Sequence, residues 1–141
     1  SVVATIAIPA RLKSTRFPGK VLVDILGHPM LWHVYQAVSE AKSAESVYIL
    51  TDSEEVFQTA ASWGAKVLMT DEDCPSGTAR IASVIDRLEG DLIVNVQADE
   101  PLIIGSIVDE IVKCLEETDA DVATPVFKIV EFILCTHKIR F

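Results

Sequence analysis

Cysteine is scarce in this sequence and never occurs in closely spaced pairs. The chain contains three cysteines, Cys74, Cys114 and Cys135. Because they are odd in number and far apart, free thiols in a reducing compartment are the simplest interpretation. The three histidines show no ligand spacing, and no HExxH motif occurs. A zinc centre is therefore not predicted, and we expect core or surface roles for the histidines.

A hydrophobic run long enough to cross a membrane is also absent. The apolar stretch VVATIAI near the start is much shorter than the about 20 residues that a transmembrane helix needs. No basic stretch precedes it, so a signal peptide is not predicted. The first residue is Ser1, not methionine, which suggests a processed or trimmed start. We therefore expect a cytoplasmic protein without membrane insertion.

Positive charge is the scarcer of the two signs. The chain has 12 Lys and Arg against 21 Asp and Glu, a net charge of -9. This balance disfavours nucleic acid as a partner. Residues 1–20 nevertheless contain no acid and hold Arg11, Lys13, Arg16 and Lys20. A polyanionic ligand would have to be met by a local positive site of this kind.

Two common phosphate-binding motifs are missing. The GxxxxGK[ST] pattern of P-loop proteins does not occur, and no GxGxxG follows the first apolar segment. A P-loop and a Rossmann dinucleotide site are both disfavoured for that reason.

What the sequence does contain is an alternation of strand and helix patterns. Apolar, β-branched segments predict strands at residues 2–8, 46–51, 66–69, 91–96 and 121–127. Apolar residues at three- and four-residue spacing predict helices over residues 30–41, 52–64, 78–88 and 104–117. This order predicts βαβ units, a mostly parallel sheet and one domain over residues 1–141. In such sheets ligands bind at the carboxyl ends of the strands.

The basic loop at residues 9–20 follows the first predicted strand. It is longer than the usual strand-to-helix connection of about 2–6 residues. Pro9 and Ala10 end the strand, and the backbone N–H groups beyond them, with Arg11 and Lys20, could surround a phosphate chain. The alternative is a solvated basic loop that balances an acidic body, and charge alone does not decide between the two.

The segment NVQADEP, residues 95–101, follows the strongest predicted strand. Gln97, Asp99 and Glu100 stand at its end, before Pro101. Carboxylates at the carboxyl edge of a sheet are well placed for Mg²⁺, which prefers oxygen ligands. An acidic turn is the equally weighted alternative.

The segment CPSGTAR, residues 74–80, precedes a predicted helix. Its hydroxyl and N–H groups could bind a base or a phosphate, although an ordinary helix start has the same composition. The final stretch, FKIVEFILCTHKIRF, is apolar and basic and differs from the rest. We expect residues 126–141 to be an atypical tail and the fold to be incomplete at the carboxyl terminus.

Five motifs taken in order resemble one enzyme family. They are IPARLKSTRFPGK, LGHPMLWHV, LTD at residues 50–52, PSGTAR and VNVQADEP. Their order and spacing resemble the 3-deoxy-D-manno-octulosonate (KDO) cytidylyltransferases, or CMP-KDO synthetases, over about residues 3–124. The STR-x-PGK loop is the most specific element, because it separates this family from CMP-sialic acid synthetases and sugar-1-phosphate nucleotidyltransferases.

The resemblance implies a fold and a reaction. The fold would be a three-layer α/β/α nucleotidyltransferase domain, Rossmann-like, with a mostly parallel sheet. The reaction would join CMP from CTP to KDO and release pyrophosphate, as a step of lipopolysaccharide biosynthesis. The anomeric hydroxyl of KDO would attack the α-phosphate in line, so that positioning and charge neutralisation dominate catalysis.

The resemblance also implies roles for single residues. Arg11 and Lys20 would hold the triphosphate, with help from Arg16 and from Pro9 and Ala10 in the same loop. These residues correspond to the basic segment IPARLKSTRFPGK.

The other motifs supply the base, sugar and metal contacts in this scheme. Ser76 and Gly77 would help to recognise cytosine, and Arg80 would support that loop or a phosphate. Gln97 would lie near the sugar, and Asp99 would ligate Mg²⁺, the expected cofactor. Arg11, Lys20 and Asp99 are the candidate catalytic residues.

The chain departs from the family at two points. Ala98 stands where the family usually has glycine, which would strain the loop if that glycine has positive φ. The family's enzymes are also longer, and their later half supplies the rest of the KDO site, a second metal carboxylate and most of a homodimer contact. A catalytically inactive CTP-binding fragment is therefore one alternative, and a synthetase for a related acid sugar of the sialic acid type is another.

Overall fold

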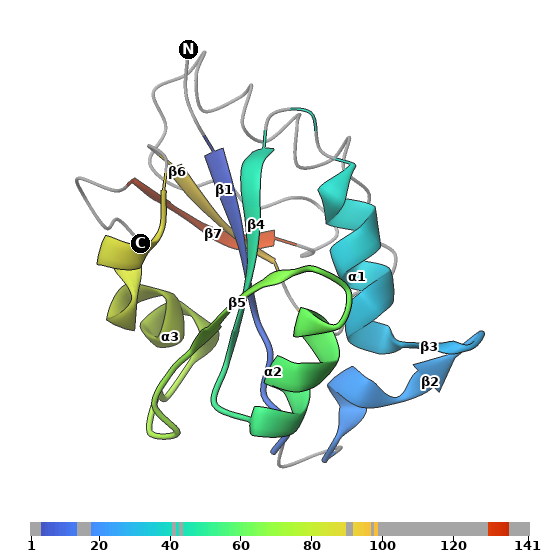
Figure 1. Cartoon of the computed structure of the whole chain (residues 1–141). Coiled ribbons are helices and arrows are strands. Elements are labelled where there is room, and N and C mark those ends of the chain that lie inside the picture. The colour runs from blue at the N-terminus through green and yellow to red at the C-terminus, as the bar shows by residue number, and fades with distance from the viewer. Residues whose placement is uncertain are drawn as a thin grey trace.

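A five-stranded sheet forms the centre of the molecule (Figure 1). The computed structural model describes residues 4–13, 18–40, 42, 44–89, 92–96, 98 and 130–135. The strands are β1 (Ala4–Pro9), β4 (Ala44–Thr51), β5 (Lys66–Met69), β6 (Leu92–Val96) and β7 (Val130–Cys135), in the spatial order β5-β4-β1-β6-β7. The first four strands run parallel and β7 is antiparallel to β6. The prediction of a mostly parallel sheet is confirmed.

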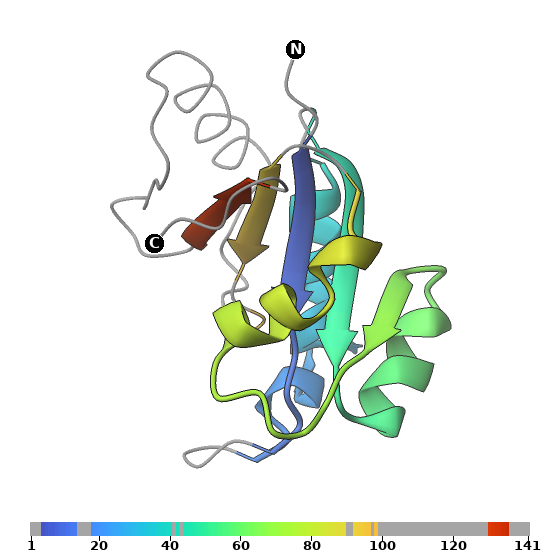
Figure 2. The same cartoon turned by 90° about the vertical axis from the view of Figure 1, so that its left-hand side faces the viewer.

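Helices cover both faces of this sheet (Figure 2). They are α1 (Met30–Ser39), α2 (Glu54–Ala61) and α3 (Gly77–Ser83), with short 3-10 turns η1 (Lys20–Leu22) and η2 (Ile85–Arg87). Apolar residues of α1 and α2 share one buried cluster with alternate residues of β1, whereas Ile81 of α3 belongs to a second cluster with Ala7. The arrangement is the expected three-layer α/β/α fold.

The central strand β1 is buried on both faces. Its first five residues, ATIAI, are all buried, and β4 and β6 flank it on either side. A parallel strand with neighbours on both edges and helices on both faces needs such an unbroken apolar sequence. Thr5 is the polar exception, and its hydroxyl donates a hydrogen bond to the backbone carbonyl of Glu89.

The helix predicted over residues 78–88 is wrong in its second half. α3 ends at Ser83, Val84 adopts φ −124°, and η2 follows. The hydroxyl of Ser83 donates to the carbonyl of Arg80, and such local bonding competes with helix propagation. Val84 and Leu88 lie in the second buried cluster, on the side where their four-residue spacing would also place them in a continuous helix.

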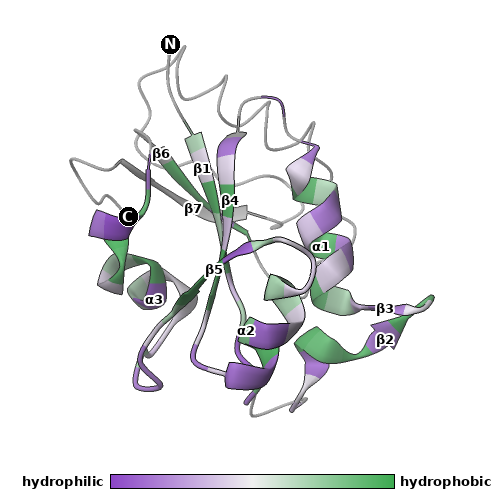
Figure 3. Cartoon of the chain, viewed as in Figure 1, coloured by the Kyte–Doolittle hydropathy of each residue, from purple (hydrophilic) through white to green (hydrophobic). Residues whose placement is uncertain are grey.

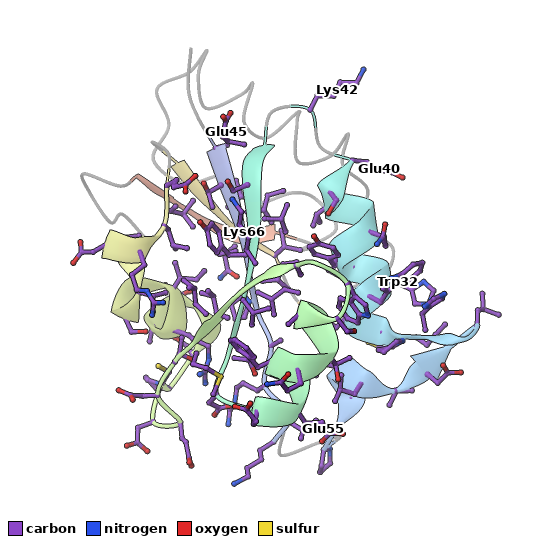
Figure 4. All side chains as sticks on the ribbon, in the orientation of Figure 1. Trp32, Glu40, Lys42, Glu45, Glu55 and Lys66 are labelled. Atoms are coloured by element: carbon purple, nitrogen blue, oxygen red, sulfur yellow. The ribbon has the colours of Figure 1, made fainter. Side chains whose placement is uncertain are left out.

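A small hairpin occupies part of the segment between β1 and α1. β2 (Asp24–Ile25) and β3 (His28–Pro29) pair antiparallel through a two-residue turn in which both residues have positive φ. His28 stacks on Trp32 of α1 at a ring separation of 3.8 Å, beside the hairpin (Figure 4). The imidazole Nε2 of His33 lies 2.6 Å from the carbonyl oxygen of Ile25. Both histidines therefore have structural contacts, as expected.

The helices α1 and α2 and the strands β4, β5 and β6 agree with the sequence patterns, whereas β7 lies within residues 126–141, where an atypical tail and no strand was expected. Figure 3 shows mostly apolar strands and a hydrophilic first turn of α2, where Ser53 caps the helix. The expected helix at residues 104–117 and strand at 121–127 lie outside the described residues. No helix in the described ranges is long and apolar enough to cross a bilayer.

Candidate functional site

The carboxyl ends of four parallel strands define the candidate site. The loops after β1, β4 and β5 and the turn after β6 all leave the same edge of the sheet. In Figure 2 the loop after β1 and the loop before α3 lie together at the lower end of the molecule. This edge is where ligands bind in open α/β sheets. The segments with candidate residues thus come together there.

The loop after β1 is anchored at both ends. The N–H group of Ala10, which is buried, donates to the carbonyl of Leu50 at 2.8 Å and extends the sheet contact past the strand. The N–H group of Gly19, at φ 77°, donates to the carbonyl of Leu12 at 2.7 Å. Because these bonds fix its two ends, the loop holds Arg11 exposed at the start and Lys20 half-buried at the end.

The loop before α3 packs directly on the end of β1. A Cβ atom built on Gly77 would lie 3.2 Å from Cγ of Pro9, closer than most real Cβ contacts. Ser76 caps the helix, because its hydroxyl accepts a hydrogen bond from the N–H of Ala79 at 3.1 Å. The structure therefore brings Pro9, Ser76 and Gly77, which the sequence assigned to two separate motifs, to one place.

Arg80 is a buried side chain that connects the loops at this edge of the sheet. Its side chain has no exposed surface, and its guanidinium lies 3.7 Å from the carboxylate of Asp52. It also donates to the hydroxyl of Thr70 and, at 2.9 Å, to the carbonyl of Asp71. Arg80 thus connects α3 to the segments after β4 and β5. Of the two roles that the resemblance implies for it, this geometry favours support of the loop.

A small cleft opens beside these loops. It has a volume of about 120 Å³ and is lined by Leu12, Lys13, Asp52, Ser53 and Glu72. Ligand pockets for molecules of drug size or larger usually measure about 300–1,000 Å³. The cleft is therefore too small to hold a whole nucleoside triphosphate.

Three candidate residues fall outside the described residues: Arg16, Gln97 and Asp99. Their neighbour Ala98 is 5% exposed and belongs to the same buried cluster as Ala10. Ala98 therefore lies at the same edge of the sheet as Ala10, the anchored end of the basic loop. The described part of the chain holds no group of three metal-ligating side chains.

Two features of the site were missed from the sequence. The Asp52–Arg80 contact joins residues of different motifs. The alternation of strands and helices indicated only that the loop after β4 and the loop before α3 lie at the same edge of the sheet. Asn95 was quoted within a motif but given no role, yet it is 1% exposed and its Nδ2 has no hydrogen-bond partner among the described residues.

Comparisons with known proteins agree with the geometry. The family model for cytidylyltransferases matches residues 5–137, beyond residue 125, where we expected the resemblance to end. The division of the chain at that residue stays a prediction. Among curated proteins, the 3-deoxy-manno-octulosonate cytidylyltransferase of Geobacter sulfurreducens is 45% identical over 116 residues, which are 82% of this chain and 46% of that protein. The protein of the same name from Francisella philomiragia is 45% identical over 130 residues, 89% of this chain and 52% of that one.

Solved structures show the same likeness. A CMP:2-keto-3-deoxy-manno-octonic acid synthetase in complex with CTP superposes with a TM-score of 0.80 at 38% identity, over 84% of this chain and 49% of that chain. A cytidylyltransferase from Leptospira borgpetersenii gives a TM-score of 0.79 at 23% identity, over 95% of this chain and 60% of that chain, which supports the fold alone. The chain spans about half the length of the curated relatives it matches. On the family model and these relatives together, the chain belongs to the cytidylyltransferase family.

Proposed function

We propose that this chain carries the CTP-binding part of an enzyme that transfers CMP from CTP to KDO and releases pyrophosphate. The observation that supports this most directly is the packing of Gly77 on Pro9. It joins the segment with the expected triphosphate residues to the segment with the expected cytosine residues. The solved synthetase with CTP, at 38% identity, supports the same nucleotide.

The chain's own residues suit the binding half of this reaction. Arg11 is exposed on an anchored loop, and its planar guanidinium can contact two phosphate oxygens at once. Lys20 stands at the other end of that loop and adds a second positive charge. The sugar hydroxyl would form the new P–O bond at the α-phosphorus while the bond to pyrophosphate breaks, and its proton would pass to solvent. Little covalent work falls on the protein, so holding the reactants in line is its main contribution.

Mg²⁺ is the cofactor that we propose, with Asp99 as its protein ligand. Ala98, next to Asp99, is buried in the cluster that contains Ala10, so a carboxylate one residue later suits a cation beside the expected triphosphate loop. A carboxylate and phosphate oxygens are the donors that Mg²⁺ prefers. When bound, the ion would neutralise phosphate charge and favour departure of pyrophosphate.

The setting of the reaction is part of the same proposal. CMP-KDO would serve lipopolysaccharide biosynthesis, and the cytoplasm, which supplies CTP, would be its compartment. The homodimer that the resemblance implies for the family stays a prediction for this chain. An inactive CTP-binding fragment is the second candidate function.

Arg11→Ala should weaken binding of Mg·CTP about tenfold, because charge-assisted bonds to phosphate are lost. Isothermal titration calorimetry of the chain with CTP and Mg²⁺ measures this. Lys42→Ala is the matched control, since Lys42 precedes β4 at the opposite edge of the sheet and the change in net charge is the same (Figure 4). Equal affinities of the two variants would contradict the assignment of Arg11.

Turnover separates the two candidate functions. Because the chain spans about half of its relatives, we expect weak binding of Mg·CTP and little or no release of pyrophosphate with CTP, KDO and Mg²⁺. A coupled pyrophosphate assay, run beside a relative of full length, measures this. Turnover comparable to that relative would show that the 141 residues are a working enzyme and would exclude the inactive fragment.

A further inference from the structure

Asn95 presents a buried hydrogen-bond donor that nothing in the described structure uses. It lies on β6 opposite Ala7 of β1, and its side chain is 1% exposed. Its Nδ2 has no hydrogen-bond partner among the described residues. Buried polar side-chain atoms are nearly always paired in native proteins, and an unpaired one lowers stability. Such a group needs a reason for its presence.

The position of Asn95 relates it to the loop before α3. Ile93, two residues earlier on β6, is buried in the cluster on the α3 side of the sheet, and side chains two apart on a strand share a face. Nδ2 lies 3.9 Å from the place that a Cβ atom on Gly77 would occupy. The donor therefore sits directly under the first residue of α3, at the junction with Pro9.

Burial restricts what this donor can reach. Nδ2 is closed off from solvent, and Gly77 is packed on Pro9 above it, so a nucleotide cannot touch it in this arrangement. Residues 74–76 lead directly into Gly77, so a movement of this loop would change how far their backbone carbonyl groups lie from Nδ2. A ligand shifts a conformational equilibrium only through interactions that differ between the two states. A donor that is unpaired in one state and paired in the other supplies such a difference.

We propose that Asn95 is a positioning residue, whose Nδ2 donates to a backbone carbonyl of residues 74–76 when the pyrimidine nucleotide is bound. This role of Asn95 rests on the proposed function. It explains why β6 carries a polar side chain in a buried position one residue before its end. Asn95 would act through the loop that holds Ser76 and Gly77, and would not contact the substrate itself. Nucleotide binding and loop placement would then be coupled.

The coupling predicts opposite effects on stability and on affinity. Asn95→Leu keeps the branching of the side chain but removes the donor. Because that donor has no hydrogen-bond partner among the described residues, the melting temperature should stay the same or rise. The dissociation constant for CTP with Mg²⁺ should increase about five- to tenfold, because a bond made only in the bound state is lost. A purely structural asparagine would lower the melting temperature instead.

Thr5→Val provides the matched control. Thr5 is buried on the same face of the sheet, and its hydroxyl already has a partner in the carbonyl of Glu89, at the opposite edge. This variant should melt at a lower temperature than the wild type and bind CTP with unchanged affinity. Asn95→Val replaces Asn95→Leu if leucine prevents folding, since it also lacks the donor and suits a strand.

The experiment is calorimetric titration of wild type, Asn95→Leu and Thr5→Val with CTP and Mg²⁺, with melting curves and hydrogen exchange of residues 74–77. We expect CTP to protect the amides of this segment in the wild type and in Thr5→Val, but much less in Asn95→Leu. Wild type that fails to bind CTP overturns the proposed function and this inference with it. Wild type that binds CTP while Asn95→Leu binds equally well, or loses stability and affinity together, overturns the role of Asn95 alone.

Discussion

Replacing Arg80 with methionine is expected to lower the free energy of unfolding by about 2 kcal/mol. Methionine fills a similar volume but cannot replace the two hydrogen bonds to Thr70 and Asp71 or the contact with Asp52. Bonds from a charged donor are worth about 1.5–3 kcal/mol each. Part of that loss is offset, because Nε of Arg80 is buried without a hydrogen-bond partner in the described structure and its removal is favourable.

Urea denaturation followed by fluorescence measures the Arg80→Met effect, with a comparison of midpoints at constant slope. Arg87→Met is the control, since Arg87 is exposed on η2 and its replacement should change stability by no more than about 0.5 kcal/mol. Arg80→Met should also bind CTP more weakly, because the segment before Ser76 loses its hydrogen bonds to α3. If Arg80→Met and Arg87→Met both had the same midpoint as the wild type, Arg80 would not stabilise the fold by connecting α3 to the segments after β4 and β5.

Asp99→Asn is expected to remove the dependence of CTP binding on Mg²⁺. The wild type should bind CTP at least about tenfold more tightly with Mg²⁺ than with EDTA, whereas the variant should show one weak affinity in both conditions. Asparagine keeps the shape of the side chain but lacks the charge that a hard divalent cation needs. Titration calorimetry in the two buffers measures this directly.

The control for this variant is Asp86→Asn, which removes the same charge from an exposed position on η2. It should retain the full difference between Mg²⁺ and EDTA. A difference that persists in Asp99→Asn would assign the metal to other residues and leave Asp99 as part of an acidic turn.

The architecture followed from the sequence where pattern and burial coincide. Residues 66–69 were predicted as a strand and form β5 with those bounds. Alternation of strands and helices was enough to place the loops after β1 and β5 at one edge. The helix predicted at residues 78–88 ends at Ser83 instead, where the hydroxyl of Ser83 bonds to the carbonyl of Arg80 and competes with helix propagation.

Long-range contacts were beyond the reach of sequence patterns. β7 lies in the segment expected to be an atypical tail, and its antiparallel pairing with β6 depends on a partner strand far away in the chain. The burial of Arg80 was not predicted either, since arginine is rarely buried and its partners Asp52 and Thr70 lie in other loops of the chain. Asn95 differs from its neighbours in β6 only by its polar side chain. That difference indicates a function only when the structure shows that Nδ2 has no hydrogen-bond partner among the described residues.

The most direct test of the whole account is nucleotide selectivity. Titration of the wild-type chain with CTP, UTP and ATP, each with Mg²⁺, compares ligands that share a triphosphate and differ in the base. If the anchored basic loop and the segment around Ser76 and Gly77 form one CTP site, CTP should bind at least about tenfold more tightly than UTP or ATP. Equal binding of all three nucleotides, or no binding of CTP, would contradict it.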